Sequence, residues 1–136
     1  MNIGPRLRAF LEEPLPIVLG TTRRDGSIQM TPLWFEYRQD QIWLNGGPRR
    51  DWFKHLKRDP RATLALVDAR NMFRWVQIQG RLADSTFEGA DDHIDHLSQR
   101  FSGRPYPAPK VERMIVRIDP ERITGSENRQ PWDVGD

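Results

Sequence analysis

The chain has 136 residues, of which 37% are hydrophobic, 10% are aromatic and none is cysteine. That length suits a single domain, the aromatic content is too high for a disordered chain, and the missing cysteines exclude disulfides, thiolate metal sites and a cysteine nucleophile. With 21 Lys and Arg against 19 Asp and Glu, the net charge is only +2, which argues against a protein whose task is to coat nucleic acid.

The N-terminal part of the chain predicts a helix followed by a β-hairpin. Apolar residues at helical spacing after Pro5 predict a short amphipathic helix over residues 5–13. Residues 17–22 and 27–37 then predict two strands that an Asp-Gly turn connects. Pro32 lies inside the second strand, so we expect an edge strand or a bulge there.

The middle of the chain predicts strands around a second helix. Residues 41–45 predict a strand, and Pro48 suits the first position of a short helix that ends near residue 57. Residues 62–67 and 73–82 predict two further strands. The chain therefore alternates short antiparallel strands with short helices.

The C-terminal part predicts one longer helix and one more strand. Ser85 and Glu88 have the spacing of a capping box, and Gly103 is a natural end for the helix that follows it. Residues 111–118 alternate in polarity and predict the last strand. Residues 126–136 are polar, and we expect them to be loosely held or to pack on a partner chain.

Six strands with short connections predict a mainly β protein. We expect a small antiparallel barrel, closed or nearly closed, with peripheral helices, as one domain over residues 1–125. A barrel of this size is filled by its own side chains. A ligand would therefore bind outside the barrel or at an interface.

The segment that connects the third strand to the second helix is the first candidate binding site. Asn45 is followed by Gly46 and Gly47, and Arg50 and Lys54 lie one helical turn apart. Glycine N–H groups, a helix N-terminus and two cations suit a phosphate group. The alternative is a structural corner with solvated basic residues.

Two strands are further candidates. In the segment Gln29-Met-Thr-Pro-Leu-Trp34, proline frees part of the backbone for a ligand, Thr31 adds a hydroxyl and Trp34 adds a flat surface; the alternative is an ordinary edge strand. Alternation in the strand over residues 73–82 predicts a mixed aromatic and amide face opposite a core face. The first face holds Phe73, Trp75, Gln77 and Gln79, and the second holds Met72, Val76, Ile78 and Leu82.

His93 and His96 lie on one face of the predicted third helix. Such a pair can bind zinc, but no third ligand is evident, so a solvated helix face is the favoured interpretation. We find no Ser/His/Asp arrangement and expect no hydrolytic machinery and no metal site.

Five motifs in order resemble those of the pyridoxamine 5′-phosphate oxidase-like split-barrel family. Within that family the resemblance is to the FMN- or deazaflavin-binding oxidoreductases that are often called F420-dependent. The motifs are Gly20-Thr-Thr-Arg-Arg-Asp-Gly26, Thr31-Pro-Leu-Trp-Phe35, His55-Leu-Lys-Arg-Asp-Pro-Arg-Ala62, Trp75-Val-Gln-Ile-Gln-Gly-Arg81 and Arg113-Met-Ile-Val-Arg-Ile-Asp-Pro-Glu-Arg122.

The resemblance implies a homodimer of split β-barrels with a flavin-type cofactor, coenzyme F420 or FMN, in grooves at the subunit interface. Arg50 and Lys54 would bind the phosphate, although many relatives carry Lys or Arg where this chain has Trp52. The implied cofactor-binding residues are Thr31, Pro32, Leu33, Trp34, Leu44, Asn45, Gly46, Gly47, Arg50, Lys54, Arg74, Trp75 and Gln77.

The implied function is hydride transfer between the reduced cofactor and a small organic acceptor, without a side-chain nucleophile. A proton donor would be Tyr37, His55, Tyr106 or water. The arginines slightly favour F420, because its oligoglutamate tail is polyanionic and needs a basic groove beyond the phosphate site. Arg49, Lys57, Arg58 and Arg61 could provide this groove.

Two other functions remain as alternatives. A non-catalytic protein could bind flavin, haem or another tetrapyrrole in the same groove. A small-barrel nucleic-acid-binding module is disfavoured by the small net charge. No run of about 20 apolar residues and no secretory signal is present, so we expect a cytoplasmic protein without a membrane or nucleic-acid partner.

Overall fold

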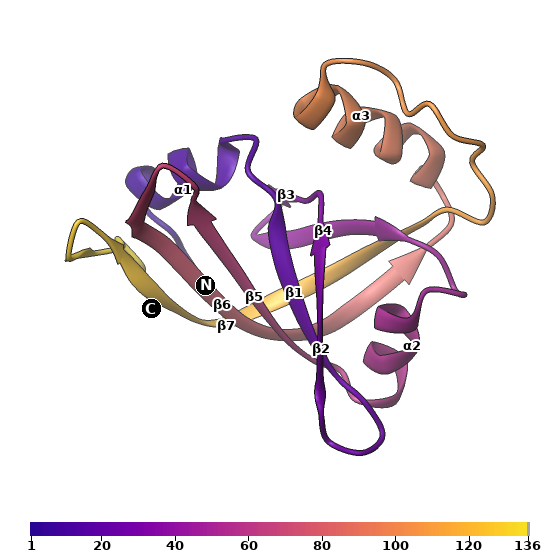
Figure 1. The fold of residues 1–136 in the computed structure, drawn as a ribbon, viewed down its shortest axis with the longest axis horizontal. Coiled ribbons are helices and arrows are strands. Elements are labelled where there is room, and N and C mark those ends of the chain that lie inside the picture. Colours follow the sequence, from indigo (N-terminus) through magenta and orange to yellow (C-terminus); the bar gives the residue numbers. More distant parts are fainter. Residues whose placement is uncertain (136) are drawn as a thin grey trace.

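An eight-stranded antiparallel sheet forms the body of the molecule in the computed structural model, which describes residues 1–135 (Figure 1). The strands are β1 Ile17–Thr22, β2 Ile28–Leu33, β3 Glu36–Arg38, β4 Gln41–Gly46, β5 Arg61–Asp68, β6 Asn71–Thr86, β7 Met114–Glu127 and β8 Gln130–Pro131. The helices are α1 Pro5–Glu12, α2 Asp51–Arg58 and α3 Ala90–Ser102.

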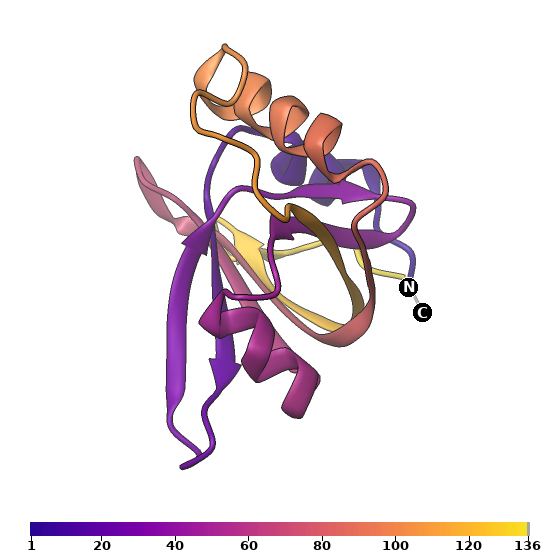
Figure 2. The same cartoon turned by 90° about the vertical axis from the view of Figure 1, so that its right-hand side faces the viewer.

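The sheet is strongly curved but does not close into a barrel (Figure 2). Its strand order is β2-β1-β5-β6-β7-β4-β3, with β8 beside β7, and within residues 1–135 the edge strands β2 and β3 do not pair. Only Trp34 and Phe35 connect these two edges in the chain. The prediction of six strands in a closed or nearly closed barrel is therefore corrected to eight strands in an open, split arrangement.

The predicted strand over residues 27–37 is two strands on opposite edges of the sheet. The break falls at Trp34 and Phe35, because Phe35 is fully buried and Trp34 stacks on Phe101 with ring centroids 5.8 Å apart. Pro32 does not interrupt β2 and pairs with Val18. Proline is tolerated there because β2 is an edge strand, as expected.

Helices α2 and α3 begin later than the sequence pattern predicts, whereas α1 begins at Pro5 as expected. Arg50 is the N-cap of α2, so Pro48 belongs to the preceding turn and not to the helix. The predicted capping box is wrong: Ser85 remains in β6 and pairs with Val116, and α3 begins after Gly89, which has a φ of 74°. The backbone N–H of Glu88 donates to Thr86 Oγ1 at 3.1 Å instead, whereas Gly103 ends α3 as predicted.

One hydrophobic core fills the inside of the curved sheet. The predicted stripe of α1 is fully buried at Leu7, Phe10 and Leu11, and α2 buries Trp52 and Leu56 on the same core. On β6 the predicted core face is confirmed at Val76 and Ile78, but Met72 is exposed at the hairpin end.

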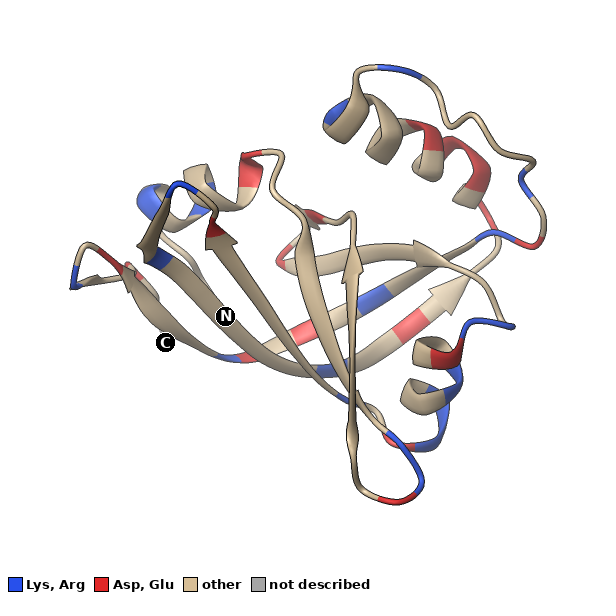
Figure 3. Ribbon diagram, viewed as in Figure 1, with Lys and Arg blue, Asp and Glu red and all other residues tan. Residues whose placement is uncertain are grey.

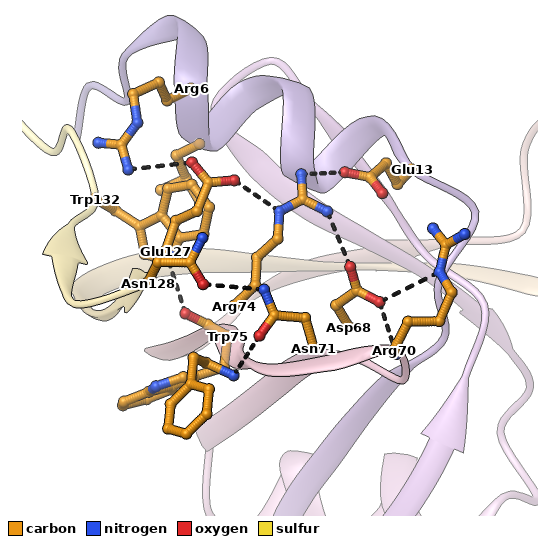
Figure 4. Close-up of polar contacts among 12 residues, drawn as sticks. Arg6, Glu13, Asp68, Arg70, Asn71, Arg74, Trp75, Glu127, Asn128 and Trp132 are labelled. Carbon is orange, nitrogen blue, oxygen red and sulfur yellow. Dashed lines mark hydrogen bonds and ion pairs between the residues drawn. The ribbon is translucent and has the colours of Figure 1, made fainter.

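The C-terminal residues pack on their own chain. Beyond β7, Trp132 is buried, stacks on Phe10 with ring centroids 5.1 Å apart, and donates from Nε1 to the Trp75 carbonyl at 2.7 Å (Figure 4). Asp133 accepts from the backbone N–H groups of Arg6 at 3.0 Å and Leu7 at 2.9 Å. The segment expected as a loose polar tail thus supplies a core ring and the carboxylate that binds the N-terminus of α1.

Candidate functional site

A cavity of about 570 Å³ opens beside the split of the sheet. Its walls are β2, the end of β4, the start of α2, one face of α3 and the segment that precedes β7. The predicted site residues that line it are Thr31, Pro32, Leu33, Trp34, Asn45, Gly46 and Arg50. Sequence reasoning included Gln29 only as part of the segment around Pro32, and it named Tyr106 only as a possible proton donor. It did not place Pro16, Asp51, Trp52, Ile94, Leu97 and Arg113 in the site.

The β2 wall combines an open backbone edge with an aromatic surface. Because β2 is an edge strand, one side of its backbone has no strand partner within residues 1–135. Thr31 accepts a hydrogen bond from Gln29 Nε2 at 3.3 Å, and Trp34 is half-buried against Phe101. A planar ligand could therefore contact the Trp34 side chain and hydrogen-bond with the free edge of β2.

The two glycines after Asn45 serve packing more than anion approach. Both are buried; a Cβ on Gly46 would overlap the Trp52 ring, and a Cβ on Gly47 would lie 2.8 Å from the Glu112 carbonyl oxygen. The Trp52 ring occupies the space that a side chain on Gly46 would fill, so the glycine makes room for an aromatic residue at position 52. Leu44, predicted as a site residue, is fully buried in the core and does not line the cavity.

Two arginines place positive charge at the cavity. Arg50 precedes α2 and Arg113 precedes β7, and Figure 3 shows their basic loops on the same side of the molecule. Within residues 1–135 neither guanidinium forms an ion pair, and Asp51 is the one acidic residue of the lining. Two cations without carboxylate partners at one cavity are suited to bind an anion.

Arg113 is held in place by two contacts. Its Nε donates to Asn45 Oδ1 at 2.7 Å, and its guanidinium lies 5.3 Å from the centre of the Tyr106 ring. Burial lowers the pKa of Arg113 from its ordinary value, and the nearby charge of Arg50 lowers it further. A half-buried guanidinium that feels a second positive charge would gain from a bound anion.

Lys54 does not join Arg50 at this cavity. It is exposed on α2 and absent from the lining, and the second cation that lines the cavity with Arg50 is Arg113. The pairing of Gly46 with Met114 brings Arg113 to the site. The signal in the sequence was a basic residue directly before a strand, and it became useful only once the partner of that strand was known.

The other basic residues near α2 are largely paired. Arg61 bonds to Asp59 at 2.6 Å and holds the pKa of that carboxyl at about 2, and Arg49 lies 3.3 Å from Glu112. Arg58 donates to the Thr22 carbonyl. Arg49, Arg58 and Arg61 of the predicted basic groove are therefore engaged within one chain, whereas Lys57 is exposed on α2.

Arg74 lies outside the cavity, in a network of carboxylates (Figure 4). Its guanidinium donates to Glu127 at 2.8 Å, to Asp68 at 3.3 Å and also to Glu13, and it covers the Phe10 ring at 4.4 Å. These partners come from β7, β5 and the end of α1. Arg74 therefore connects three elements and does not line the cavity.

Trp75 and Gln77 also lie away from the cavity, on the outward face of β6. Of the proposed proton donors, only Tyr106 lines the cavity. His55 Nδ1 is hydrogen-bonded to Thr21 Oγ1 at 3.0 Å, and burial raises the pKa of Tyr37.

The two histidines of α3 differ from the prediction of a solvated face. His93 is buried and His96 is exposed, and both contact the buried carboxylate of Glu36, at 3.4 Å and 2.8 Å. No group of three or more potential metal ligands occurs in the described part of the chain. No helix within residues 1–135 is long and apolar enough to cross a membrane.

The family model described as pyridoxamine 5′-phosphate oxidase matches residues 3–126 of this chain. A comparison with curated proteins found no match. Among solved structures, an F420 reductase has a TM-score of 0.78 and 22% identity, over 86% of this chain and 94% of that chain. A conserved hypothetical protein from Mycobacterium tuberculosis has a TM-score of 0.74 and 22% identity, over 98% of this chain and 86% of that chain.

The haem storage protein HutZ from Vibrio cholerae is also similar, with a TM-score of 0.64 and 16% identity, over 90% of this chain and 94% of that chain. At these identities the likeness concerns the fold alone. The same fold is thus found in a reductase and in a haem storage protein.

Proposed function

Because the chain belongs to the pyridoxamine 5′-phosphate oxidase family, we propose that it is an oxidoreductase that binds coenzyme F420 or FMN in the cavity beside β2. The family contains flavin-type oxidoreductases and typically binds FMN. The proposed reaction transfers hydride between the reduced cofactor and a small organic acceptor. The observation that carries this proposal is the pair of guanidiniums, Arg50 and Arg113, at a cavity that also has a flat aromatic wall.

The residues at the cavity fit such a cofactor in charge and shape. A volume of about 570 Å³ lies in the range of small-molecule sites. Arg50 and Arg113 would bind the phosphate, and the free edge of β2 would hydrogen-bond with the polar edge of the ring system. Trp34 would cover part of the ring and exclude water.

The bound cofactor would supply the hydride chemistry from its ring. The protein would orient the ring and hold the negative charge, which requires no side-chain nucleophile. Among the residues that line the cavity, Tyr106 carries a phenol, and its hydroxyl would be the proton donor.

The proposal is tested by titrating the purified protein with FMN and with F420 while following cofactor fluorescence. Tight binding of one of them, followed by oxidation of the reduced form in the presence of an acceptor, supports it. Binding without turnover against a panel of acceptors would favour the non-catalytic alternative, and binding of haem alone would refute the flavin assignment.

We also propose that the chain forms a homodimer through the outward face of β2, β1, β5 and β6. In the strand register, Met30 lies in one row with Thr63 and Gln79, and Val67 pairs with Trp75. Exposed apolar side chains on this face are Ile28, Met30, Val67, Phe73 and Trp75. Such a face is unusual for a monomer. In the dimer, Trp75 and Gln77 would lie at the subunit interface.

Light scattering after gel filtration tests the dimer. Val67→Arg should shift the protein to the monomer, because it places a charge inside the proposed interface. Val111→Arg is the matched control, since Val111 is also exposed but lies in the loop before β7. Equal effects of the two substitutions would contradict the proposed interface.

A further inference from the structure

Asn45 connects the proposed phosphate site to a buried histidine. Its side chain accepts a hydrogen bond from Arg113 Nε at 2.7 Å through Oδ1. Its Nδ2 lies 2.9 Å from the Ala90 carbonyl and 3.1 Å from His93 Nδ1. Asn45 and His93 are both more than nine-tenths buried. The amide therefore has all its contacts inside the protein.

Chemistry fixes the orientation of this amide. Arg113 Nε–H can only donate, so the atom that faces it must be Oδ1, and the Ala90 carbonyl can only accept, so the atom that faces it must be Nδ2. The second N–H of Nδ2 then points at His93 Nδ1. That ring nitrogen must accept, which places the imidazole proton on Nε2.

A carboxylate lies on the Nε2 side of the ring. Glu36 Oε1 is 3.4 Å from His93 Nε2, and His96 Nε2 contacts the other oxygen of the same carboxylate at 2.8 Å. Burial tends to raise the pKa of Glu36, but His93, His96 and Arg38 together lower it below its ordinary value. Glu36 Oε1 and His93 Nε2 are buried and not hydrogen-bonded within the described residues, so the carboxylate acts on the ring through its charge, which favours a proton on Nε2.

We propose that His93 is a positioning residue for the cofactor site: in its neutral Nε2–H form it orients Asn45, and Asn45 in turn orients Arg113 toward the anion. This role rests on the proposed function of Arg113 in binding the phosphate. Protonated His93 would direct a second N–H at Asn45 Nδ2, and two donors would face each other. If the amide kept its orientation, these two donors would repel each other; if it turned to relieve that contact, its N–H group would face Arg113 and the hydrogen bond to Arg113 would be lost.

The expected effect of His93 protonation on phosphate binding is opposite to the effect expected from charge alone. An added positive charge near a phosphate should strengthen binding, whereas the hydrogen-bond arrangement predicts weaker binding when His93 is protonated. Charged groups of both signs face His93 or the cavity beside it. They are Glu36 and Arg38 from β3, Glu88 from the loop after β6, Asp92 and His96 from α3, and Arg117 from β7.

Two substitutions separate positioning from structural support. His93→Asn retains an oxygen at the position of Nδ1 that can accept from Asn45 but cannot titrate. It should therefore keep the affinity for the cofactor and remove the part of its pH dependence that comes from protonation of His93. His93→Phe removes the acceptor and should lower the affinity by about 10-fold or more at every pH. His96→Gln is the matched control, because His96 contacts the same carboxylate but not Asn45.

The test combines two measurements on the full chain. Imidazole ¹⁵N shifts report the tautomer and protonation of His93, and the Arg113 Nε–H resonance reports its hydrogen bond. We expect the Nε2–H tautomer, and a change of the Arg113 resonance at the pH where His93 becomes protonated, in the wild type and in His96→Gln. The Nδ1–H tautomer, or an Arg113 resonance that does not follow His93, would overturn the inference.

The second measurement is the affinity for FMN and for F420 between pH 5 and pH 8. The FMN phosphate itself titrates near pH 6, so the His93→Asn variant provides the baseline. The wild type should lose affinity on acidification beyond that baseline, and an identical pH profile in both proteins would overturn the positioning role. If the expected tautomer is found but neither cofactor binds, the proposed function itself fails and the positioning role falls with it.

Discussion

Removing the Trp132 side chain should destabilise the protein strongly, although the residue lies in a segment of polar sequence. Trp132 is buried, stacks on Phe10 at 5.1 Å and donates to the Trp75 carbonyl at 2.7 Å. Replacing a buried aromatic residue with alanine costs about 3–5 kcal/mol. Trp132→Ala should therefore lower the free energy of unfolding by about 3–4 kcal/mol, and the melting temperature of a domain of this size by about 10–15 °C.

Trp132→Phe separates the two contributions. Phenylalanine keeps the stacking on Phe10 but leaves the Trp75 carbonyl without its donor, which should cost about 1–2 kcal/mol. Urea unfolding of the wild type and both variants gives the free energies. A cost below about 1 kcal/mol for Trp132→Ala would refute the conclusion that the C-terminal segment is part of the core.

Three further predictions concern the site, acid stability and the choice of cations. Gly46→Ala places a methyl group into the Trp52 ring, so it should cost about 1–3 kcal/mol of stability in urea unfolding and weaken cofactor binding; a neutral effect would contradict the packing. Burial tends to raise the pKa of Asp133, but hydrogen bonds from the backbone N–H groups of two α1 residues lower it below 3.8. The stability it contributes is present above about pH 4 and is lost as pH falls through the lowered pKa, so Asp133→Asn should flatten the acid unfolding profile, and an unchanged profile would contradict this. Arg50→Gln should weaken cofactor binding whereas Lys54→Gln should not; the reverse in fluorescence titrations would restore Lys54 to the site.

Local patterns were sufficient to predict the elements whose partners are near in sequence. The helix after Pro5, the strand Ile17–Thr22 and the Asp-Gly hairpin that follows it occur as expected, because apolar spacing and turn chemistry determine them. The capping box at Ser85 failed for the complementary reason. Its residues pair with β7, and a distant strand decided between two locally acceptable structures.

The distance in sequence between contacting residues also explains which parts of the candidate site could be predicted. Residues 31–34 and Asn45 could be placed in one cavity from the order of the motifs. Arg113 could not, because it reaches Asn45 only through the pairing of β4 with β7 across 68 positions of sequence. The contacts of Arg74 could not be predicted either, since its carboxylate partners come from three elements far apart in the chain, and these contacts hold it outside the cavity.

The most direct test of the account is the contribution of the phosphate to binding. Riboflavin differs from FMN only in lacking that group, so the ratio of the two dissociation constants isolates it. Two charge-assisted contacts from Arg50 and Arg113 should make FMN bind at least about 10-fold more tightly than riboflavin. In the Arg50→Gln and Arg113→Gln variants this preference should shrink, while riboflavin affinity stays unchanged; if F420 is the cofactor, its phosphate-free deazariboflavin serves in the same comparison. A preference for the phosphate that both variants retain would contradict the assignment of this cavity as the cofactor site.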